Sequence, residues 1–160
     1  MLFMWDPLHP EKTVQQIQRY CAFQDRSTHD VMEKLKSLGV PYPRIKSLVM
    51  ELAEERFIDE ERFVRSFVIG KFRQNKWGKI KIAYALKSKG IPESLTREGL
   101  ENIDEEDYRS ALKTLVKRKL SEIKGEKNLN VRQKIINFAL GKGFEMALVL
   151  EIIKEIKIDP

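Results

Sequence analysis

The sequence predicts an all-α protein built from three tandem three-helix repeats that form an elongated, curved array. One helix-ending pattern occurs three times, and its last glycines, Gly39, Gly90 and Gly143, stand 51 and 53 residues apart. Each repeat also begins with a helix-capping pattern, and no segment shows the alternation of a half-buried strand. Periods near 50 residues are typical of repeated supersecondary units, which stack into extended bodies with a long exposed face.

The three helix-ending segments read LKSLGV, LKSKGI and ALGKGF. Glycine easily adopts the left-handed conformation that ends a helix, and the apolar residue after it can fold back onto the last turn. Apolar residues eight and four positions before each glycine give each helix one apolar stripe. These pairs are Val31 and Leu35, Ile82 and Leu86, and Ile135 and Ala139.

The first repeat, residues 1–56, contains an N-terminal tail and three predicted helices. Ser27 with Asp30 resembles a capping box and begins the second helix. Pro41 follows the first helix-ending segment and suits the start of the third helix. The predicted ranges are 10–23, 28–38 and 42–56.

The second and third repeats are predicted over residues 57–103 and 104–160. Acidic runs at 59–61 and 104–107 suit helix starts, where the helix dipole favours negative charge. Pro92 begins a further helix, and residues 125–128 are predicted as a loop. The predicted helices are 60–75, 78–89, 93–101, 105–124, 130–142 and 145–157.

The tail and the cysteine content indicate a cytoplasmic protein. The apolar residues 1–5 lack a basic flank and end at Asp6-Pro7, so they do not form a signal peptide. Cys21, the only cysteine, excludes an intrachain disulfide and is expected to be buried. No apolar run approaches the length of a membrane span. Three alternatives are open for the apolar tail residues: packing on the body, packing on a partner, or partial disorder. These residues are Leu2, Phe3 and Trp5.

Basic residues concentrate in the middle of the chain. The net charge is +6, and the 31 residues from Arg62 to Pro92 hold no Asp or Glu. Such a segment suits a polyanion such as nucleic acid, or else is a solvated face whose acidic partners lie elsewhere in the fold. Its nine basic residues are Arg62, Arg65, Lys71, Arg73, Lys76, Lys79, Lys81, Lys87 and Lys89.

Helical geometry gathers some of these residues on one face. At 100° per residue, Lys71 projects from the apolar side of helix 60–75, where its long stem can reach solvent or a junction between repeats. The opposite side carries a basic stripe within an arc of roughly 80°. This stripe consists of Arg62, Arg65, Arg73 and Lys76.

The turn around Trp77-Gly78 has two interpretations. The following helix start, flanked by Lys76 and Lys79, can hold a phosphate through its free N–H groups, and Trp77 can stack on a base or enter a partner's pocket. Alternatively, Trp77 packs between two helices and Gly78 only serves a turn. A second basic cluster is predicted where two helices of the third repeat meet, at Lys117, Arg118, Lys119, Arg132 and Lys134.

Enzymatic chemistry is not indicated. His9 and His29 are the only histidines, and neither has a metal-ligand neighbour one helical turn away. There is no Gly-rich phosphate-binding loop of the P-loop type. The acids at 104–107 are consecutive on a helix start, so they cannot converge on one ion, and helix capping explains them better. No cofactor or metal is expected.

The motifs resemble a known family, the bacterial RecX regulatory proteins. The resemblance rests on residues 57–63 (FIDEERF), Gly78, Ile82 and residues 86–91, and it extends through 15–157. Ala85 and Ile69 depart from the family's usual glutamate and basic residue. The resemblance implies a non-enzymatic, cytoplasmic protein that binds RecA recombinase, chiefly as its filament on single-stranded DNA. It implies inhibition of RecA ATP hydrolysis, strand exchange and filament growth, and a role in homologous recombination, DNA repair and the SOS response to DNA damage.

Two other functions are compatible with the same residues. A general DNA-binding helical protein would bind naked single-stranded or duplex DNA without affecting RecA. A helical adaptor would dock a protein through its apolar N-terminus. In each case we expect a monomer that does not associate with membranes.

Overall fold

The computed structural model describes residues 4–123 and 130–158, and within these ranges the regular structure is entirely helical. The all-α prediction is confirmed, and every described helix boundary lies within two residues of its predicted position. The predicted loop 125–128 and the tail residues Leu2 and Phe3 lie outside the described residues. The helices are α1 Pro10–Phe23, α2 Thr28–Ser37, α3 Tyr42–Glu54, α4 Glu60–Arg73, α5 Lys79–Ser88, α6 Glu93–Leu100, α7 Glu105–Ile123, α8 Val131–Gly141 and α9 Met146–Ile156.

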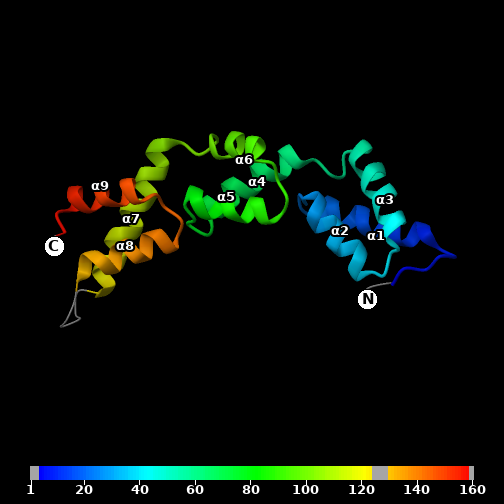
Figure 1. Cartoon of the computed structure of the whole chain (residues 1–160), viewed down its shortest axis with the longest axis horizontal. Coiled ribbons are helices and arrows are strands. Elements are labelled where there is room, and N and C mark those ends of the chain that lie inside the picture. The colour runs from blue at the N-terminus through cyan, green and yellow to red at the C-terminus, as the bar shows by residue number, and fades with distance from the viewer. Residues whose placement is uncertain (1–3, 124–129, 159–160) are drawn as a thin grey trace.

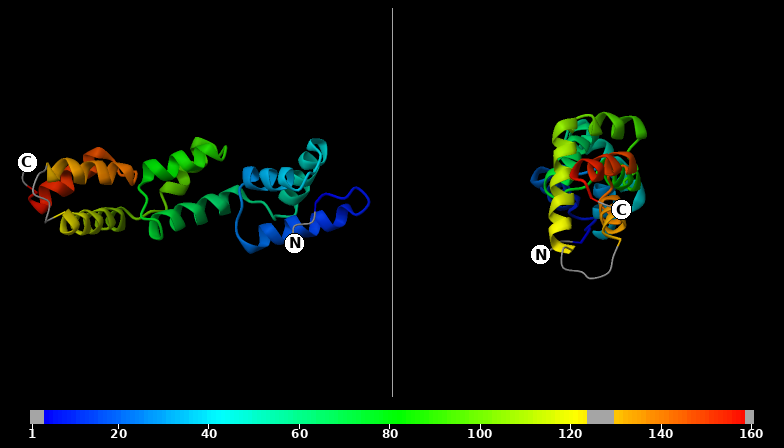
Figure 2. Two further views of the ribbon diagram at one scale, coloured as in Figure 1. Left: turned by 90° about the horizontal axis from the view of Figure 1, so that it is seen from below. Right: turned by 90° about the vertical axis from the view of Figure 1, so that its left-hand side faces the viewer.

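The helices form three groups of three, arranged in an elongated, gently arched row (Figure 1). Helices α1–α3 occupy one end, α4–α6 the middle and α7–α9 the other end, and the turned views show the same order (Figure 2). The extensive helix–helix packing lies within the groups, with α4 against α6 and α7 against α8 as the largest contacts. Few direct helix–helix contacts therefore cross from one group to the next.

The predicted caps explain why the helices begin and end where they do. Gly39, Gly90 and Gly143 have φ angles of +80°, +73° and +92°. The amide of the next residue donates to the carbonyl five positions earlier in each case, at 3.1–3.2 Å, which closes the helix end. Ser27 and Asp30 form the predicted capping box. Interactions between residues close in sequence thus set the helix ends that recur in each repeat.

The apolar core is divided unequally among the three groups. Helices α1–α3 surround their own core, which includes the fully buried Ile17, Leu35 and Leu48. Cys21 is 4% exposed in this core, as predicted, and Trp5 packs against it. Helices α4–α9 share one continuous core. The first group is therefore an independently packed unit, whereas the second and third are fused.

Two glycines make the junction between the second and third groups possible. Gly78 donates to the carbonyl of Lys142 at 2.8 Å, and Ile80 donates to the carbonyl of Gly143 at 3.0 Å. A Cβ atom at Gly78 would lie 2.2 Å from the Gly143 oxygen. Gly78 has φ of −79°, which any residue can adopt, so the turn by itself does not need glycine here. Close backbone approach requires this glycine.

Tyr108 completes that junction. Its ring, 2% exposed, lies between Phe72 of α4 and Phe144, with centroid separations of 5.8 and 5.0 Å. Its hydroxyl donates to Glu145 at 2.7 Å and accepts from the Lys79 amide at 2.8 Å. Burial raises the pKa of this hydroxyl well above its usual value, so Tyr108 stays protonated and keeps both bonds.

The junction between the first and second groups is polar. Asp25, in the α1–α2 loop, accepts from Arg62 Nε at 2.7 Å and from the Ser66 hydroxyl at 2.6 Å. Asp30 accepts from Lys89 Nζ at 2.5 Å. The Ser66 bond, followed by Arg62, holds the pKa of Asp25 below its usual value. Burial alone would raise the pKa of Asp30, but bonds from Lys89 and Ser27 outweigh it and lower the pKa.

Acid should therefore loosen this junction. Because both carboxyl pKa values are depressed in the folded protein, their stabilisation is complete above the ordinary value of 3.8 and is lost as pH falls through the lower folded values. We expect the radius of gyration, measured by small-angle X-ray scattering, to rise below about pH 3.8. Circular dichroism over the same range monitors helix content.

A matched control removes the two carboxylates of this junction by substitution instead of by acid. Asp25→Asn combined with Asp30→Asn should enlarge the radius of gyration at neutral pH and abolish its dependence on pH. A wild-type radius that stays constant while the helices remain folded would show that the ion pairs do not hold the groups together.

Candidate functional site

The basic run from Arg62 to Lys89 separates into three sets in the structure. The first set faces solvent, and the described part of the chain places no acidic group within ion-pairing distance of it. A polyanion can approach these side chains without displacing an internal partner. They are Arg65, Arg73, Lys76 and Lys87.

The second set is paired with acids from other groups. Arg62 bonds Asp25, Lys89 bonds Asp30, and Lys79 bonds Glu105 at the start of α7. These cations hold the repeats together, as the solvated-face interpretation anticipated for part of the run. Exposed ion pairs are weak, generally below about 1 kcal/mol, so Arg62 remains accessible to a competing anion.

The third set surrounds Trp77. The Nζ atoms of Lys71 and Lys81 each lie 4.8 Å from the Trp77 ring centroid. The ring is partly buried and packs against the shared core. This placement favours the packing interpretation of Trp77 over base stacking, and it places Lys71 near a junction between groups.

Two local predictions about this region are wrong. Helix α4 ends at Arg73, and Lys76 follows in a left-handed turn with φ of +56°, so Lys76 does not continue the helical stripe. The amides at 78–80, where α5 begins, are not free to form a phosphate site. Those of Gly78, Lys79 and Ile80 already donate to Lys142, Tyr108 and Gly143.

The residues of the second basic cluster lie on α7 and α8, which pack against each other. Arg118 and Lys119 both reach Glu122, at 3.3 and 3.5 Å, and Lys119 Nζ lies 5.5 Å from the Phe138 ring centroid. Lys117 is exposed, and Arg132 and Lys134 are half-buried. Binding of a polyanion by this cluster stays a prediction.

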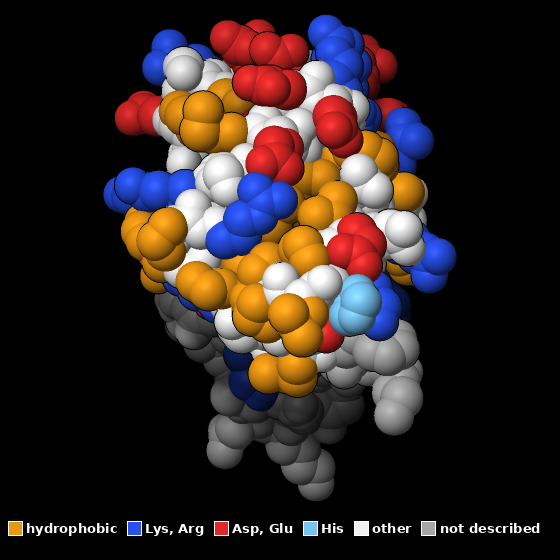
Figure 3. All heavy atoms as spheres, turned by 90° about the vertical axis from the view of Figure 1, so that its right-hand side faces the viewer, with side chains coloured by type: hydrophobic (Ala, Val, Ile, Leu, Met, Phe, Trp, Pro, Cys, Tyr) orange, Lys and Arg blue, Asp and Glu red, His pale blue; other side chains and the backbone are white. Residues whose placement is uncertain are grey.

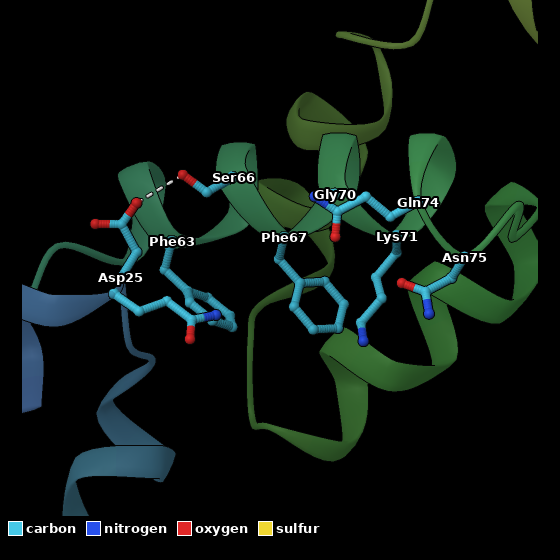
Figure 4. A pocket seen from close by; sticks show the side chains of 9 residues that line it. Asp25, Phe63, Ser66, Phe67, Gly70, Lys71, Gln74 and Asn75 are labelled. Carbon is cyan, nitrogen blue, oxygen red and sulfur yellow. Dashed lines mark hydrogen bonds between the residues drawn. The ribbon is translucent and has the colours of Figure 1, made fainter.

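Sequence reasoning missed a cleft between the first and second groups. Its volume is about 370 Å³, and Figure 4 shows side chains of α4 projecting into it beside the α1–α2 loop. The only trace of this cleft in the sequence is the row of phenylalanines on one face of α4, and that pattern is equally typical of core packing. The lining residues are Gln24, Asp25, Phe63, Ser66, Phe67, Gly70, Lys71, Gln74 and Asn75.

Sequence reasoning also missed an apolar patch on α5. Ile80 and Tyr84 are 55% and 76% exposed, one helical turn apart, and they line a second cavity of about 550 Å³ together with Lys87. The i, i+4 apolar spacing was the available signal. The rim of this cavity is polar, with Lys87, Glu93 and Thr96 in its lining, and adjoining exposed apolar side chains with a polar rim are typical of protein-contact sites.

The free end of the first group mixes all side-chain types. Figure 3 shows hydrophobic side chains spread over this end face, with acidic groups gathered at one edge. Exposed hydrophobic residues of the first group include Met4, Leu8, Tyr42 and Met50. The Trp5 side chain packs against the core of the first group, and its backbone amide donates to the Leu38 carbonyl at 2.7 Å, so this part of the tail serves the fold.

Other classes of site find no support in the residues that the structure describes. Over 4–123 and 130–158, no three His, Cys, Asp or Glu side chains are grouped to hold a metal ion. In the same ranges, no helix is long and apolar enough to cross a membrane. The Asp104 carboxylate accepts from the Asp107 amide at 2.9 Å, which confirms its capping role.

Together, the fold and its basic surface define a helical-repeat protein of the tandem three-helix class. Two family models match the chain: the second three-helix domain of RecX at residues 59–100 and the third at 105–153. Together they cover more than half of the sequence. The chain belongs to the RecX family of regulatory proteins.

Individual relatives agree with this assignment. The regulatory protein RecX of Clostridium acetobutylicum is 27% identical over 82% of this chain, and that of Halalkalibacterium halodurans is 27% identical over 92%. The chain spans 62% and 56% of the lengths of these two relatives.

Solved structures show the same fold. A crystal structure of regulatory protein RecX superposes with a TM-score of 0.80 at 24% identity, covering 91% of this chain and 71% of that one. RecX from Lactobacillus salivarius superposes with a TM-score of 0.78 at 22% identity, covering 92% and 96%.

Proposed function

We propose that this protein binds RecA and its filament on single-stranded DNA and inhibits RecA ATP hydrolysis, strand exchange and filament growth. It would thereby modulate homologous recombination and DNA repair. The supporting observation is that the second RecX domain, residues 59–100, contains the whole basic run. The protein acts without catalysis, as a monomer in the cytoplasm.

Each group of helices has a proposed part in this activity. We assign residues 57–103 as the central binding unit, with residues 1–56 and 104–160 as flanking units that extend the contact along the filament. The arched row matches a helical groove in shape (Figure 1). The basic surface matches DNA phosphates or acidic protein surface in charge.

The binding residues remain those of the basic run, with roles graded by their surroundings. Direct contacts with the ligand come from the solvent-facing cations Arg65, Arg73, Lys76 and Lys87. The ion-paired cations add only to the positive electrostatic potential of the surface; these are Arg62, Lys79 and Lys89. Ile80 and Tyr84 supply the apolar contact that a protein partner needs, since aromatic anchors dominate protein interfaces. The second basic cluster, on α7 and α8, extends the surface.

The direct test is RecA ATPase activity on single-stranded DNA, measured with increasing amounts of this protein. We expect inhibition to grow with concentration and to parallel filament binding measured by co-sedimentation. Binding to naked DNA without any effect on RecA would favour a general DNA-binding helical protein. Absence of both inhibition and filament binding would falsify the proposal.

A further inference from the structure

The cleft between the first group and α4 has the composition of a site for a flat polar group. Phe67, which is partly exposed, supplies aromatic surface beside the buried Phe63. The carboxamides of Gln24, Gln74 and Asn75 each offer donors and an acceptor. Lys71 Nζ lies 5.3 Å from the Phe67 ring centroid. A volume of about 370 Å³ lies at the small end of ligand sites, so one ring system fits and a helix does not.

Gly70 lines this cleft and leaves open space beside α4. It lies inside α4, where glycine costs about 1 kcal/mol of helix stability relative to alanine. Its φ is not positive, and a Cβ atom added there would meet nothing within 4 Å. Neither backbone conformation nor packing requires this glycine. Figure 4 shows the Gln74 carboxamide beside it, at the wall of the cleft.

The charges around the cleft favour an anionic ligand with a planar part. The only acid in the lining, Asp25, is bonded by Arg62 and Ser66 and is therefore neutralised. Lys71 is left as a positive group inside the cleft. Arg73 and Lys76 follow α4 residues of the lining and are exposed, so phosphates on either side of a bound ring can find cations.

We propose that this cleft binds one unstacked base of a single-stranded nucleic acid, with the base on Phe67 and its polar edge against the carboxamides. Stacking on an aromatic ring and bonding to amide groups are the usual means of holding an unpaired base. Because Gln24 and Asp25 belong to the first group, a bound base fixes that group against α4. This proposal rests on the proposed function and specifies its contact with the DNA strand.

The test compares two fluorescent oligonucleotides of equal length and charge. One is oligothymidine, and the other carries abasic tetrahydrofuran residues in place of the nucleosides. We expect wild-type protein to bind oligothymidine about fivefold to 100-fold more tightly by fluorescence anisotropy, the range that stacking on an aromatic side chain supplies. Gly70→Leu should remove this preference and leave the affinity for the abasic strand unchanged.

Gly141→Leu is the matched control, because Gly141 also lies in a helix with nothing within 4 Å of an added Cβ atom, but outside the cleft. It should retain the preference for bases. Phe67→Leu provides a second variant that removes the stacking surface without filling the cleft, and circular dichroism monitors folding of all variants.

Equal binding of both strands by the wild type would overturn the base site and leave the electrostatic DNA contact standing. If the protein bound neither strand, both the base site and the electrostatic DNA contact would be overturned. Unchanged strand preference in Gly70→Leu, together with weaker binding to DNA-free RecA, would assign the cleft to a protein side chain instead and overturn the proposal.

Discussion

Replacement of Gly78 by alanine should lower the free energy of unfolding by about 3–5 kcal/mol and loosen the packing of the third group of helices on the second. The added Cβ atom would lie 2.2 Å from the Gly143 carbonyl oxygen and 2.4 Å from the Phe144 nitrogen, and these are backbone atoms that no rotamer change can move. Overpacking of this kind costs about 1–3 kcal/mol. Loss of the hydrogen bonds to the Lys142 and Gly143 carbonyls would each cost about 1 kcal/mol more.

Chemical denaturation followed by circular dichroism measures this effect. Gly141→Ala is the matched control, since an added Cβ atom there meets nothing within 4 Å. It should leave stability unchanged or raise it by up to about 1 kcal/mol, because alanine favours the helix. If Gly78→Ala were as stable as the wild type, the two groups would have to pack in some other way.

Reversal of Arg73 and Lys76 to glutamate should weaken binding to the RecA filament or to DNA about 10-fold or more, without loss of helix. Both side chains are exposed, and in the described ranges neither has an acidic partner. If each contacts a phosphate of single-stranded DNA, the slope of log K against log salt should flatten by about 0.7 per lost contact. Anisotropy titrations over a range of salt concentrations measure both quantities.

A control for net charge is Lys12→Glu with Lys154→Glu, on exposed positions of α1 and α9 near the two ends of the row. This pair changes the total charge by the same amount, so it should reduce affinity much less if binding is local. Equal losses in the two double variants would mean that only the overall field matters. Lys79 is not a suitable target, because reversal would break its ion pair with Glu105.

The helices could be predicted closely from sequence because their signals are local. A capping box spans four residues, and the residue after each left-handed glycine donates to a carbonyl five positions back. Asp59 likewise accepts from the amide of Arg62, three positions on. Residue type and spacing alone encode these interactions, so one sequence was enough to place them.

The surface could be predicted only in part. The basic run was evident, but its pattern did not show which cations are internally paired. Arg62 meets Asp25 across 37 positions, Lys79 meets Glu105 across 26, and Lys89 meets Asp30 across 59. The predicted basic stripe on α4 also lacks one member, because α4 ends at Arg73 and Lys76 lies outside the helix.

The sequence by itself therefore determined the helices, their caps, the threefold repeat and the family resemblance. Only the tertiary structure decided that the second and third groups share one core while the first joins through ion pairs, and that a cleft lies at that joint. The physical reason is distance along the chain. Caps and stripes depend on neighbours within one or two helical turns. The close approach of Gly78 to Gly143, and a cleft lined by both Gln24 and Phe67, depend on how whole helices pack.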